Sequence, residues 1–268
     1  MRRGALVAAV AVGLVAVAAG GWAAVGGPAV ERAFASPLRP VKAPPPLRLR
    51  EKCVTRVERR RVVRFRAIDG VRLIGVELGR GPRGVVLAHS AYAQQNLCSW
   101  MPYGRTLARA GYRVLVFDQR SFGSSGDPSH WRRQGQVDWD VLGAIRTLRA
   151  RGAKSIVLAG ASLGGAAVLS AAAQAVPAVD GVISFSSPQS YVRVNALAAV
   201  QALRVPVLFL AAEDDGEYAN VARMLYEACA SAEKRLEIVP GHVHGEGLWR
   251  NSAVRPLVDA FIARHSAP

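Results

Sequence analysis

The sequence predicts an α/β protein in which a mostly parallel central sheet is covered by helices on both faces, with an antiparallel hairpin on its N-terminal side. Short, continuously apolar segments alternate with longer amphipathic segments over residues 84–265. Strands that are apolar along their whole length must be buried on both faces, which requires a parallel sheet between two layers of helices. Hydrophobic residues make up 51% of the chain and charged residues 20%, as in globular rather than disordered proteins.

An antiparallel hairpin opens the folded part of the chain. Its two β-like runs, VVRFRA from Val62 and VRLIGVEL from Val71, are separated by Asp69-Gly70, a pair that suits the positive φ of a tight turn. Apolar strands are then expected at 84–90, 112–120, 155–162, 181–187, 205–215 and 235–240. Helices are expected at 96–111, 137–152, 163–175, 190–203, 217–230 and 251–265.

The N-terminal part differs in composition from the rest. An apolar segment, 1–27, and a linker rich in proline and arginine, 28–52, precede the expected folded domain, 53–268. Two arginines stand before the apolar run and an A-x-A pattern at 33–35 follows it, as in a secretory signal peptide. The run also reaches membrane-spanning length, so an uncleaved anchor is the alternative. We therefore expect an exported domain, either secreted or held at the membrane by this segment.

The net charge of +16 at first suggests a nucleic-acid partner. The excess is concentrated at the N-terminal end, because residues 1–66 carry 14 lysines and arginines against three acids, whereas residues 67–268 carry 21 against 16. No aromatic-basic sheet pattern or zinc-finger spacing accompanies the charge. Nucleic acid is therefore not an expected partner, and the sequence carries no signal for oligomeric state.

Three cysteines, Cys53, Cys98 and Cys229, leave at least one thiol without a partner within the chain. An exported protein can hold one disulfide, but the spacing does not identify the pair. No CxxC motif or neighbouring His/Cys group accompanies these cysteines, so we expect no metal site.

A candidate nucleophile lies in the stretch GASLG. Gly160 and Gly164 flank Ser162, directly after an expected strand and before an expected helix. In a sharp strand-to-helix turn a serine takes strained backbone angles, and side chains at the flanking positions would collide. The alternative is a plain turn between a strand and a helix of small residues. We interpret Ser162 as a nucleophile because the strand and the helix supply the required context.

A serine nucleophile needs a general base, and the base needs a carboxylate that orients it. Acids and histidines follow the next strand ends, which gather at one edge of a parallel sheet. They are Glu213, Asp214, Asp215, His242 and His244. The residues alone leave the choice among these acids and histidines open.

From about Val54 to its end, the chain resembles an α/β-hydrolase-fold serine hydrolase of the esterase or dienelactone-hydrolase kind, in which serine, acid and histidine follow in this order. The family's acid commonly stands in G-x-x-D before proline or glycine. AAEDDG matches with alanine in place of that glycine, which selects Asp215 over Asp214. The family's histidine often stands as H-G, which selects His244 over His242.

The resemblance also implies an oxyanion hole made by the backbone N–H groups of Ala91 and Leu163. The first of these follows His89-Ser90, where many members of the family have His-Gly, so the conformational freedom of glycine is lost at Ser90. The segment DQRSFG resembles the family's Asp-x-Arg-Gly-x-Gly loop with a similar serine for glycine exchange. The resemblance implies that Asp118 and Arg120 are structural there, bracing one another and nearby backbone.

Many members of the family carry a cap domain. This sequence has no room for one, because only residues 188–204 lie between the expected strands 181–187 and 205–215. We therefore expect an open site, with the loop 124–139 as a candidate wall. Trp131 and Trp139 offer apolar surface in that loop, or pack within the fold.

The resemblance implies a carboxylesterase-like serine hydrolase, with Ser162, Asp215 and His244 as its triad. Its partner would be a small-molecule ester or thioester, and no cofactor is required. Two alternatives remain open: an acyltransferase or peptidase that uses the same triad, and a binding protein that uses the fold without catalysis.

Overall fold

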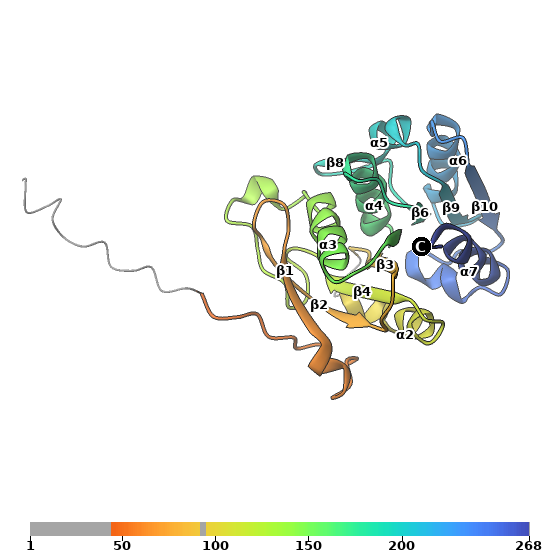
Figure 1. Ribbon diagram of the computed structural model, residues 1–268. Coiled ribbons are helices and arrows are strands. Elements are labelled where there is room, and N and C mark those ends of the chain that lie inside the picture. The colour runs from red at the N-terminus through yellow and green to blue at the C-terminus, as the bar shows by residue number, and fades with distance from the viewer. Residues whose placement is uncertain (1–43, 92–94, 268) are drawn as a thin grey trace, which may run out of the picture. The chain divides into compact units, whose positions relative to one another are not determined.

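In the computed structural model, which describes residues 44–91 and 95–267, Pro46 to the C-terminus forms one compact unit built on an eight-stranded sheet (Figure 1). The strand order is β1-β2-β4-β3-β5-β6-β9-β10. The strands are β1 (Val62–Arg66), β2 (Arg72–Leu78), β3 (Arg83–Ala88), β4 (Arg113–Asp118), β5 (Ser155–Ala161), β6 (Gly181–Phe185), β9 (Val207–Ala212) and β10 (Lys234–Val239). Strand β2 is antiparallel to both β1 and β4, and the remaining pairs are parallel. The predicted fold class is confirmed.

Helices cover both faces of this sheet (Figure 1). They are α2 (Met101–Arg109), α3 (Asp138–Ala150), α4 (Leu163–Gln174), α5 (Ala196–Ala202), α6 (Tyr218–Ala228) and α7 (Val254–His265). Helices α3, α4, α5 and α6 pack on one face, whereas α2 and α7 pack on the other, each face with its own buried apolar cluster. Two layers of helices explain why the parallel strands are apolar along their whole length.

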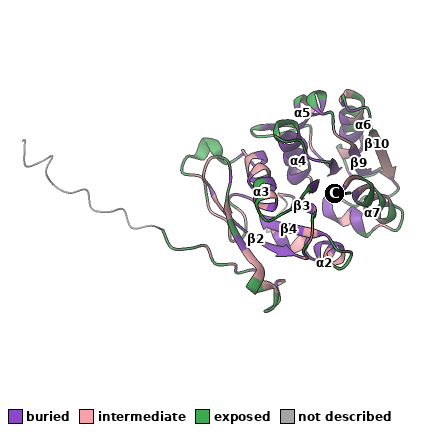
Figure 2. Ribbon diagram, viewed as in Figure 1, coloured by how far each residue is buried: buried purple, intermediate pink, exposed green. Residues whose placement is uncertain are grey.

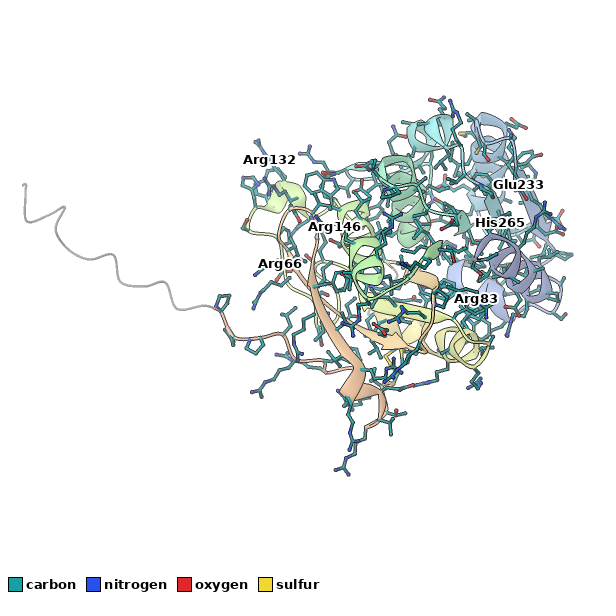
Figure 3. The ribbon with its side chains drawn as sticks, viewed as in Figure 1. Arg66, Arg83, Arg132, Arg146, Glu233 and His265 are labelled. Carbon is teal, nitrogen blue, oxygen red and sulfur yellow. A yellow bond between two sulfur atoms is a disulfide. The ribbon has the colours of Figure 1, made fainter. Side chains whose placement is uncertain are left out.

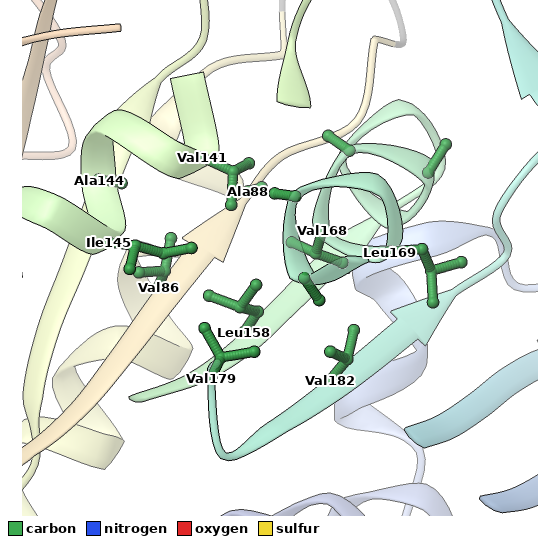
Figure 4. Close-up of a cluster of buried hydrophobic side chains, with 14 of the residues drawn as sticks. Val86, Ala88, Val141, Ala144, Ile145, Leu158, Val168, Leu169, Val179 and Val182 are labelled. Carbon is green, nitrogen blue, oxygen red and sulfur yellow. The ribbon is translucent and has the colours of Figure 1, made fainter. Parts of the chain in front are cut away.

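The larger cluster lies between the sheet and helices α3 and α4 (Figure 4). Val86, Leu158 and Val182 come from three adjacent strands and are 0% exposed, and they pack with Ile145 of α3 and Val168 of α4. The central strands are buried along most of their length, and exposed residues lie on the outer helix faces, in loops and on the edge strands β1 and β10 (Figure 2). This packing holds the carboxyl ends of β3, β5, β6 and β9 rigidly side by side.

The helix expected at 190–203 is wrong in its first part. A short hairpin, β7 (Ser190–Tyr191) with β8 (Val194–Asn195), precedes the helix, and Val192 between them has a φ of +49°. The helix begins at Ala196 because the Asn195 side chain accepts the N–H of Ala198 and caps it. Only this hairpin and helix α5 stand between β6 and β9.

The expected signal or anchor, 1–27, lies outside the described residues. Within the part of the chain that the structure describes, no helix is long and apolar enough to cross a membrane.

Cys53 and Cys98 form a disulfide, and Cys229 is a buried free thiol. The disulfide joins the segment before β1 to the 3₁₀ turn η2 (Leu97–Ser99).

Candidate active site

Ser162 occupies the turn between β5 and α4, with φ of +50° and ψ of −117°. Such angles are strained for any residue with a side chain, and they occur where the surrounding structure enforces them. A Cβ at position 160 would collide with the Gly164 carbonyl, and one at 164 would collide with the Ala88 carbonyl. The two glycines of the motif are therefore required by close backbone approach, as the sequence predicts.

Asp215 and His244 lie together at the same edge of the sheet. His244 Nδ1 is 2.9 Å from each carboxylate oxygen of Asp215, and that carboxylate is buried. The other three candidates, Glu213, Asp214 and His242, are exposed. The structure thus pairs the acid and the histidine that the family resemblance selected and leaves the alternatives in solvent.

Ser186, at the end of β6, holds this pair in place and was missed from the sequence. Its hydroxyl donates to Asp215 Oδ2 at 2.7 Å and accepts the backbone N–H of Gly245 at 3.1 Å. Its φ of +44° turns the chain so that the side chain meets both partners. Its position in the chain could have identified Ser186. The pair Ser186-Ser187 directly follows β6, and β6 lies next to β5, the strand that leads to Ser162.

The nucleophile turn and the histidine segment are adjacent. The backbone N–H of Ser162 donates to the Phe185 carbonyl at 2.8 Å, one residue before Ser186. A Cβ on Gly245 would lie 3.5 Å from Cβ of Ala161. The Ser162 hydroxyl has no hydrogen-bond partner among the described residues, His244 included, and catalytic hydrogen bonds of this kind are often long before a substrate binds.

The expected oxyanion donors, Ala91 and Leu163, lie beside this turn. A Cβ at Gly164 would also press against the His89 carbonyl at 2.6 Å, so the first turn of α4 touches the end of β3. The Ala91 and Leu163 side chains pack on the same apolar cluster. Both backbone N–H groups therefore belong to segments that meet next to Ser162.

Buried His89 orients the peptide between Ser90 and Ala91. Its Nε2 accepts the Gln119 backbone N–H at 3.1 Å, so Nδ1 carries the proton and donates to the Ser90 carbonyl at 2.7 Å. Burial lowers the pKa of His89, which keeps the ring neutral. The N–H of a trans peptide points away from its C=O, so the Ala91 N–H is directed away from His89. Ser90 itself has no positive φ, and glycine is not needed there.

Glu246 fixes the other side of Ser90 and was also missed from the sequence. Its Oε1 accepts the Ser90 N–H at 2.7 Å and the Ser99 hydroxyl at 3.0 Å, and the residue is 5% exposed. The Gln95 amide, with its nitrogen turned toward this carboxylate, donates to Glu246 Oε1 at 3.0 Å and to Ser90 Oγ at 2.7 Å. The sequence signal that could have indicated Glu246 is its place in the stretch HGEG, two residues after His244.

Asp118 and Arg120 brace the backbone as expected, but the expectation that they brace one another is wrong. Asp118 accepts the backbone N–H groups of Leu97 and Ser124, each at 2.8 Å. Arg120 is 0% exposed and instead pairs with Asp69 at 3.0 Å and Asp140 at 2.7 Å. A buried guanidinium requires buried carboxylates, and two acids distant in sequence supply them.

Two hollows are lined by residues of the candidate site, one by Leu163 and the other by Asp215 and His244. The Leu163 hollow encloses about 470 Å³, and its apolar lining comes from Phe122, Trp131, Val137, Leu163, Tyr191 and Val192. The His244 hollow encloses about 430 Å³ and is lined by Gln95, Asp215, Tyr218, His244 and Glu246. Trp131 is therefore a wall residue, 71% exposed, whereas Trp139 lines a different depression beside Ile68 and α3.

A further cavity of about 190 Å³ lies away from this site. Val207, Glu233 and His265 line it at the amino end of β9, opposite the end that carries Asp215. Figure 3 shows Glu233 and His265 close together, and His265 Nε2 is 3.3 Å from Glu233 Oε1. Reactive groups in parallel sheets gather at the carboxyl ends of the strands, so the hollows beside Ser162 define the candidate site. The described residues contain no group of His, Cys, Asp and Glu that could hold a metal ion.

Comparisons with known proteins agree with this fold. A protein-family model described as alpha/beta hydrolase fold matches residues 84–228. No curated protein sequence gives a significant match. The esterase Pf2001 of Pyrococcus furiosus is similar in structure, with a TM-score of 0.63, 19% identity, and coverage of 77% of this chain and 92% of that one.

Two further esterase structures resemble this chain. RhEst1 from Rhodococcus sp. matches with a TM-score of 0.62, 16% identity, and coverage of 76% of this chain and 99% of that one. EaEST from Exiguobacterium antarcticum matches with a TM-score of 0.59, 16% identity, and coverage of 74% and 98%. At these identities the solved structures show a shared fold. Because the family model spans more than half of the sequence, the chain belongs to the α/β-hydrolase fold family.

Proposed function

We propose that the protein is a serine hydrolase that cleaves carboxylic esters or thioesters through an acyl-enzyme on Ser162. The observation that carries the proposal is the Asp215–His244 pair, 2.9 Å apart, beside a serine held at φ of +50° on a strand-to-helix turn. A strained serine next to an oriented histidine is the arrangement that nucleophilic catalysis requires. Esterases among the structurally similar proteins support the same reaction class.

In this mechanism the carboxylate of Asp215 accepts a hydrogen bond from Nδ1–H of His244, so that Nε2 carries no proton and can act as the base. His244 Nε2 takes the Ser162 proton while Oγ attacks the acyl carbon, and the oxyanion is bound by the N–H groups of Ala91 and Leu163. Nε2 then gives the proton to the departing alkoxide or thiolate. Water attacks the acyl-enzyme by the same route, releasing the acid and restoring Ser162.

We also propose that the domain is exported, either secreted or anchored to the membrane by its N-terminal segment. The Cys53–Cys98 disulfide supports this, because disulfides persist in oxidising compartments and are rare in the cytosol. Expression with and without residues 1–35, followed by cell fractionation, would test it. Retention of the full chain in the cytosol would contradict export.

The test of the proposed activity is labelling by a fluorophosphonate probe, followed by turnover of p-nitrophenyl acetate. The native protein should be labelled, and Ser162→Ala should lose both labelling and turnover while keeping its circular dichroism spectrum. The matched control is Ser187→Ala, one strand away from the nucleophile, which should keep both. Unchanged turnover in Ser162→Ala would reject the mechanism, and absence of labelling in the native protein would favour a non-catalytic role.

A further inference from the structure

The Leu163 hollow is lined by positive charge and by no acid. Arg120, Arg132 and Arg193 line it, and its other lining residues are uncharged. The Arg120 guanidinium is balanced by the two buried carboxylates described above. Arg132 and Arg193 are exposed, and among the described residues neither guanidinium has a carboxylate or hydrogen-bond partner. The hollow therefore has two cationic side chains whose charge is not balanced within this part of the chain.

These two arginines come from segments that are far apart in the sequence and meet at the hollow. Arg132 projects into solvent from the 3₁₀ turn η3 (Trp131–Arg133) (Figure 3). Arg193 lies in the turn of the β7–β8 hairpin, directly after Val192. A Cβ at Gly135 would lie 2.5 Å from Val192 Cγ1, so the hairpin rests on the backbone that follows η3. This contact brings both guanidinium groups to one hollow, although like charges repel one another.

The turn that carries Arg193 is strained and exposes apolar surface. Val192 has a φ of +49°, which is rare for a β-branched residue, and it is 78% exposed. Strained backbone of this kind often occurs at ligand-binding sites. Trp131 and Tyr191, 71% and 37% exposed, add aromatic surface to the same hollow. A ligand with an apolar part would cover these side chains and remove them from water.

The hollow adjoins the nucleophile, because Leu163 directly follows Ser162. Its volume of about 470 Å³ lies within the range of ligand pockets, which are mainly apolar with a few polar groups. Resting on the proposed ester hydrolysis, we propose that the substrate has an apolar arm with an anionic group, a carboxylate or a phosphate, that binds Arg132 and Arg193. Guanidinium groups suit such anions because they donate two parallel hydrogen bonds to them.

Charge also decides between the two hollows of the site. The His244 hollow is lined by the carboxyl groups of Asp215 and Glu246, and a further anion beside them is disfavoured. The Leu163 hollow has no acid in its lining. The anionic arm therefore enters the Leu163 hollow.

The test compares esters that differ in one charge. The first pair is the p-nitrophenyl monoester of adipic acid, whose free end is a carboxylate, and its neutral methyl ester. The second pair is 4-(butyryloxy)benzoate and its neutral methyl ester, so that the charge is tested on the leaving group as well as on the acyl chain. The value of kcat/KM is measured for each, and the ratio of charged over neutral ester is compared between variants. Raising the salt from about 0.01 M to about 1 M should lower this ratio, because it shortens the Debye length from about 30 Å to about 3 Å.

Arg132→Gln/Arg193→Gln removes both charges and keeps most of each side chain. In one of the two pairs the ratio of charged over neutral ester should fall by about threefold to tenfold, the effect of two exposed ion pairs. Arg132→Lys/Arg193→Lys keeps the charges and should keep most of the ratio. The matched control is Arg80→Gln/Lys154→Gln, which removes two exposed charges before β3 and β5, at the edge of the sheet opposite Ser162, and should leave the ratio unchanged.

Flotation with vesicles separates a soluble anionic ester from an anionic lipid as the source of the anion. Binding to phosphatidylglycerol but not to phosphatidylcholine vesicles, lost in Arg132→Gln/Arg193→Gln and kept in Arg80→Gln/Lys154→Gln, would assign the hollow to a lipid. A charge-dependent ratio for the soluble esters without such binding would assign it to a soluble ester. If the substitutions at 132 and 193 change neither the ester ratios nor vesicle binding, the proposal is overturned.

The outcomes separate this inference from the activity on which it rests. If neutral esters are hydrolysed in a Ser162-dependent way and neither the ratios nor vesicle binding depends on the two arginines, the inference fails and the serine hydrolase stands. If no ester is turned over and Ser162 is not labelled, the proposed function fails, and this inference fails with it.

Discussion

Replacing Glu246 by alanine tests whether this carboxylate holds Ser90, and with it the next residue, Ala91, whose N–H is the proposed oxyanion donor. The N–H of Ser90, a residue that is 1% exposed, would lose its acceptor at 2.7 Å. Hydrogen bonds to charged groups contribute about 1.5–3 kcal/mol, and a buried donor without a partner lies at the upper part of that range. The Ser99 hydroxyl keeps a bond to the Asn96 carbonyl at 3.1 Å and adds little. We expect Glu246→Ala to lower the free energy of unfolding by about 2–3 kcal/mol.

The same substitution should reduce kcat more than it changes KM. Losing one oxyanion donor completely lowers kcat by about 10²–10³. His89 still holds the Ser90 carbonyl in this variant, so the Ala91 N–H is displaced rather than lost. We therefore expect kcat for p-nitrophenyl acetate to fall by about tenfold to a hundredfold, with KM nearly unchanged because the oxyanion forms only in the transition state. Glu246→Gln, which retains an acceptor oxygen for Ser90, should recover part of kcat.

The assay is steady-state kinetics at a temperature at which all variants are folded, combined with urea unfolding of the same preparations. Glu237→Ala is the control, because its carboxylate pairs with Arg235 on β10 at 3.0 Å and is far along the sheet from Ser90. If Glu246→Ala loses stability but keeps kcat within about twofold of the parent, Glu246 is only structural and the reasoning is refuted.

Three further predictions concern neighbouring groups. Ser186→Ala removes the bridge between Asp215 and Gly245, and we expect kcat to fall by about tenfold in the same ester assay; an unchanged kcat would show that Asp215 needs no such support. Trp131→Ala opens the Leu163 hollow, so kcat/KM should fall for p-nitrophenyl hexanoate more than for the acetate; equal losses would place the acyl chain elsewhere. Burial, with Glu51 nearby, raises the pKa of Asp118 to about 8 from the ordinary 3.8, so the folded chain holds a proton that the unfolded chain releases in this range. The thermal midpoint should therefore fall as the pH rises from about 4 to about 8, and Glu51→Gln should flatten that fall in calorimetry; a midpoint that rises with pH in this range would contradict the assignment.

Local patterns in the sequence were sufficient for the fold. Continuous apolar runs identified the parallel strands, and Asp69-Gly70 identified the hairpin, because burial and turn geometry act on residues close together in the chain. The one wrong element, a helix over 190–203, failed where a single side chain decided the outcome. The cap provided by Asn195 starts the helix late, and the residues before it pair as a short hairpin.

The residues around Ser162 were enough to identify the nucleophile turn, since Gly160, Ser162 and Gly164 need only a strand before them and a helix after them. Which acid faces which histidine depends instead on the packing of the whole domain. The tertiary structure also brought Ser186 to Asp215 and Glu246 to Ser90, across 29 and 156 residues of sequence. Such contacts depend on which strand ends become neighbours in the sheet, and strand order is set by the packing of the whole domain rather than by any local pattern.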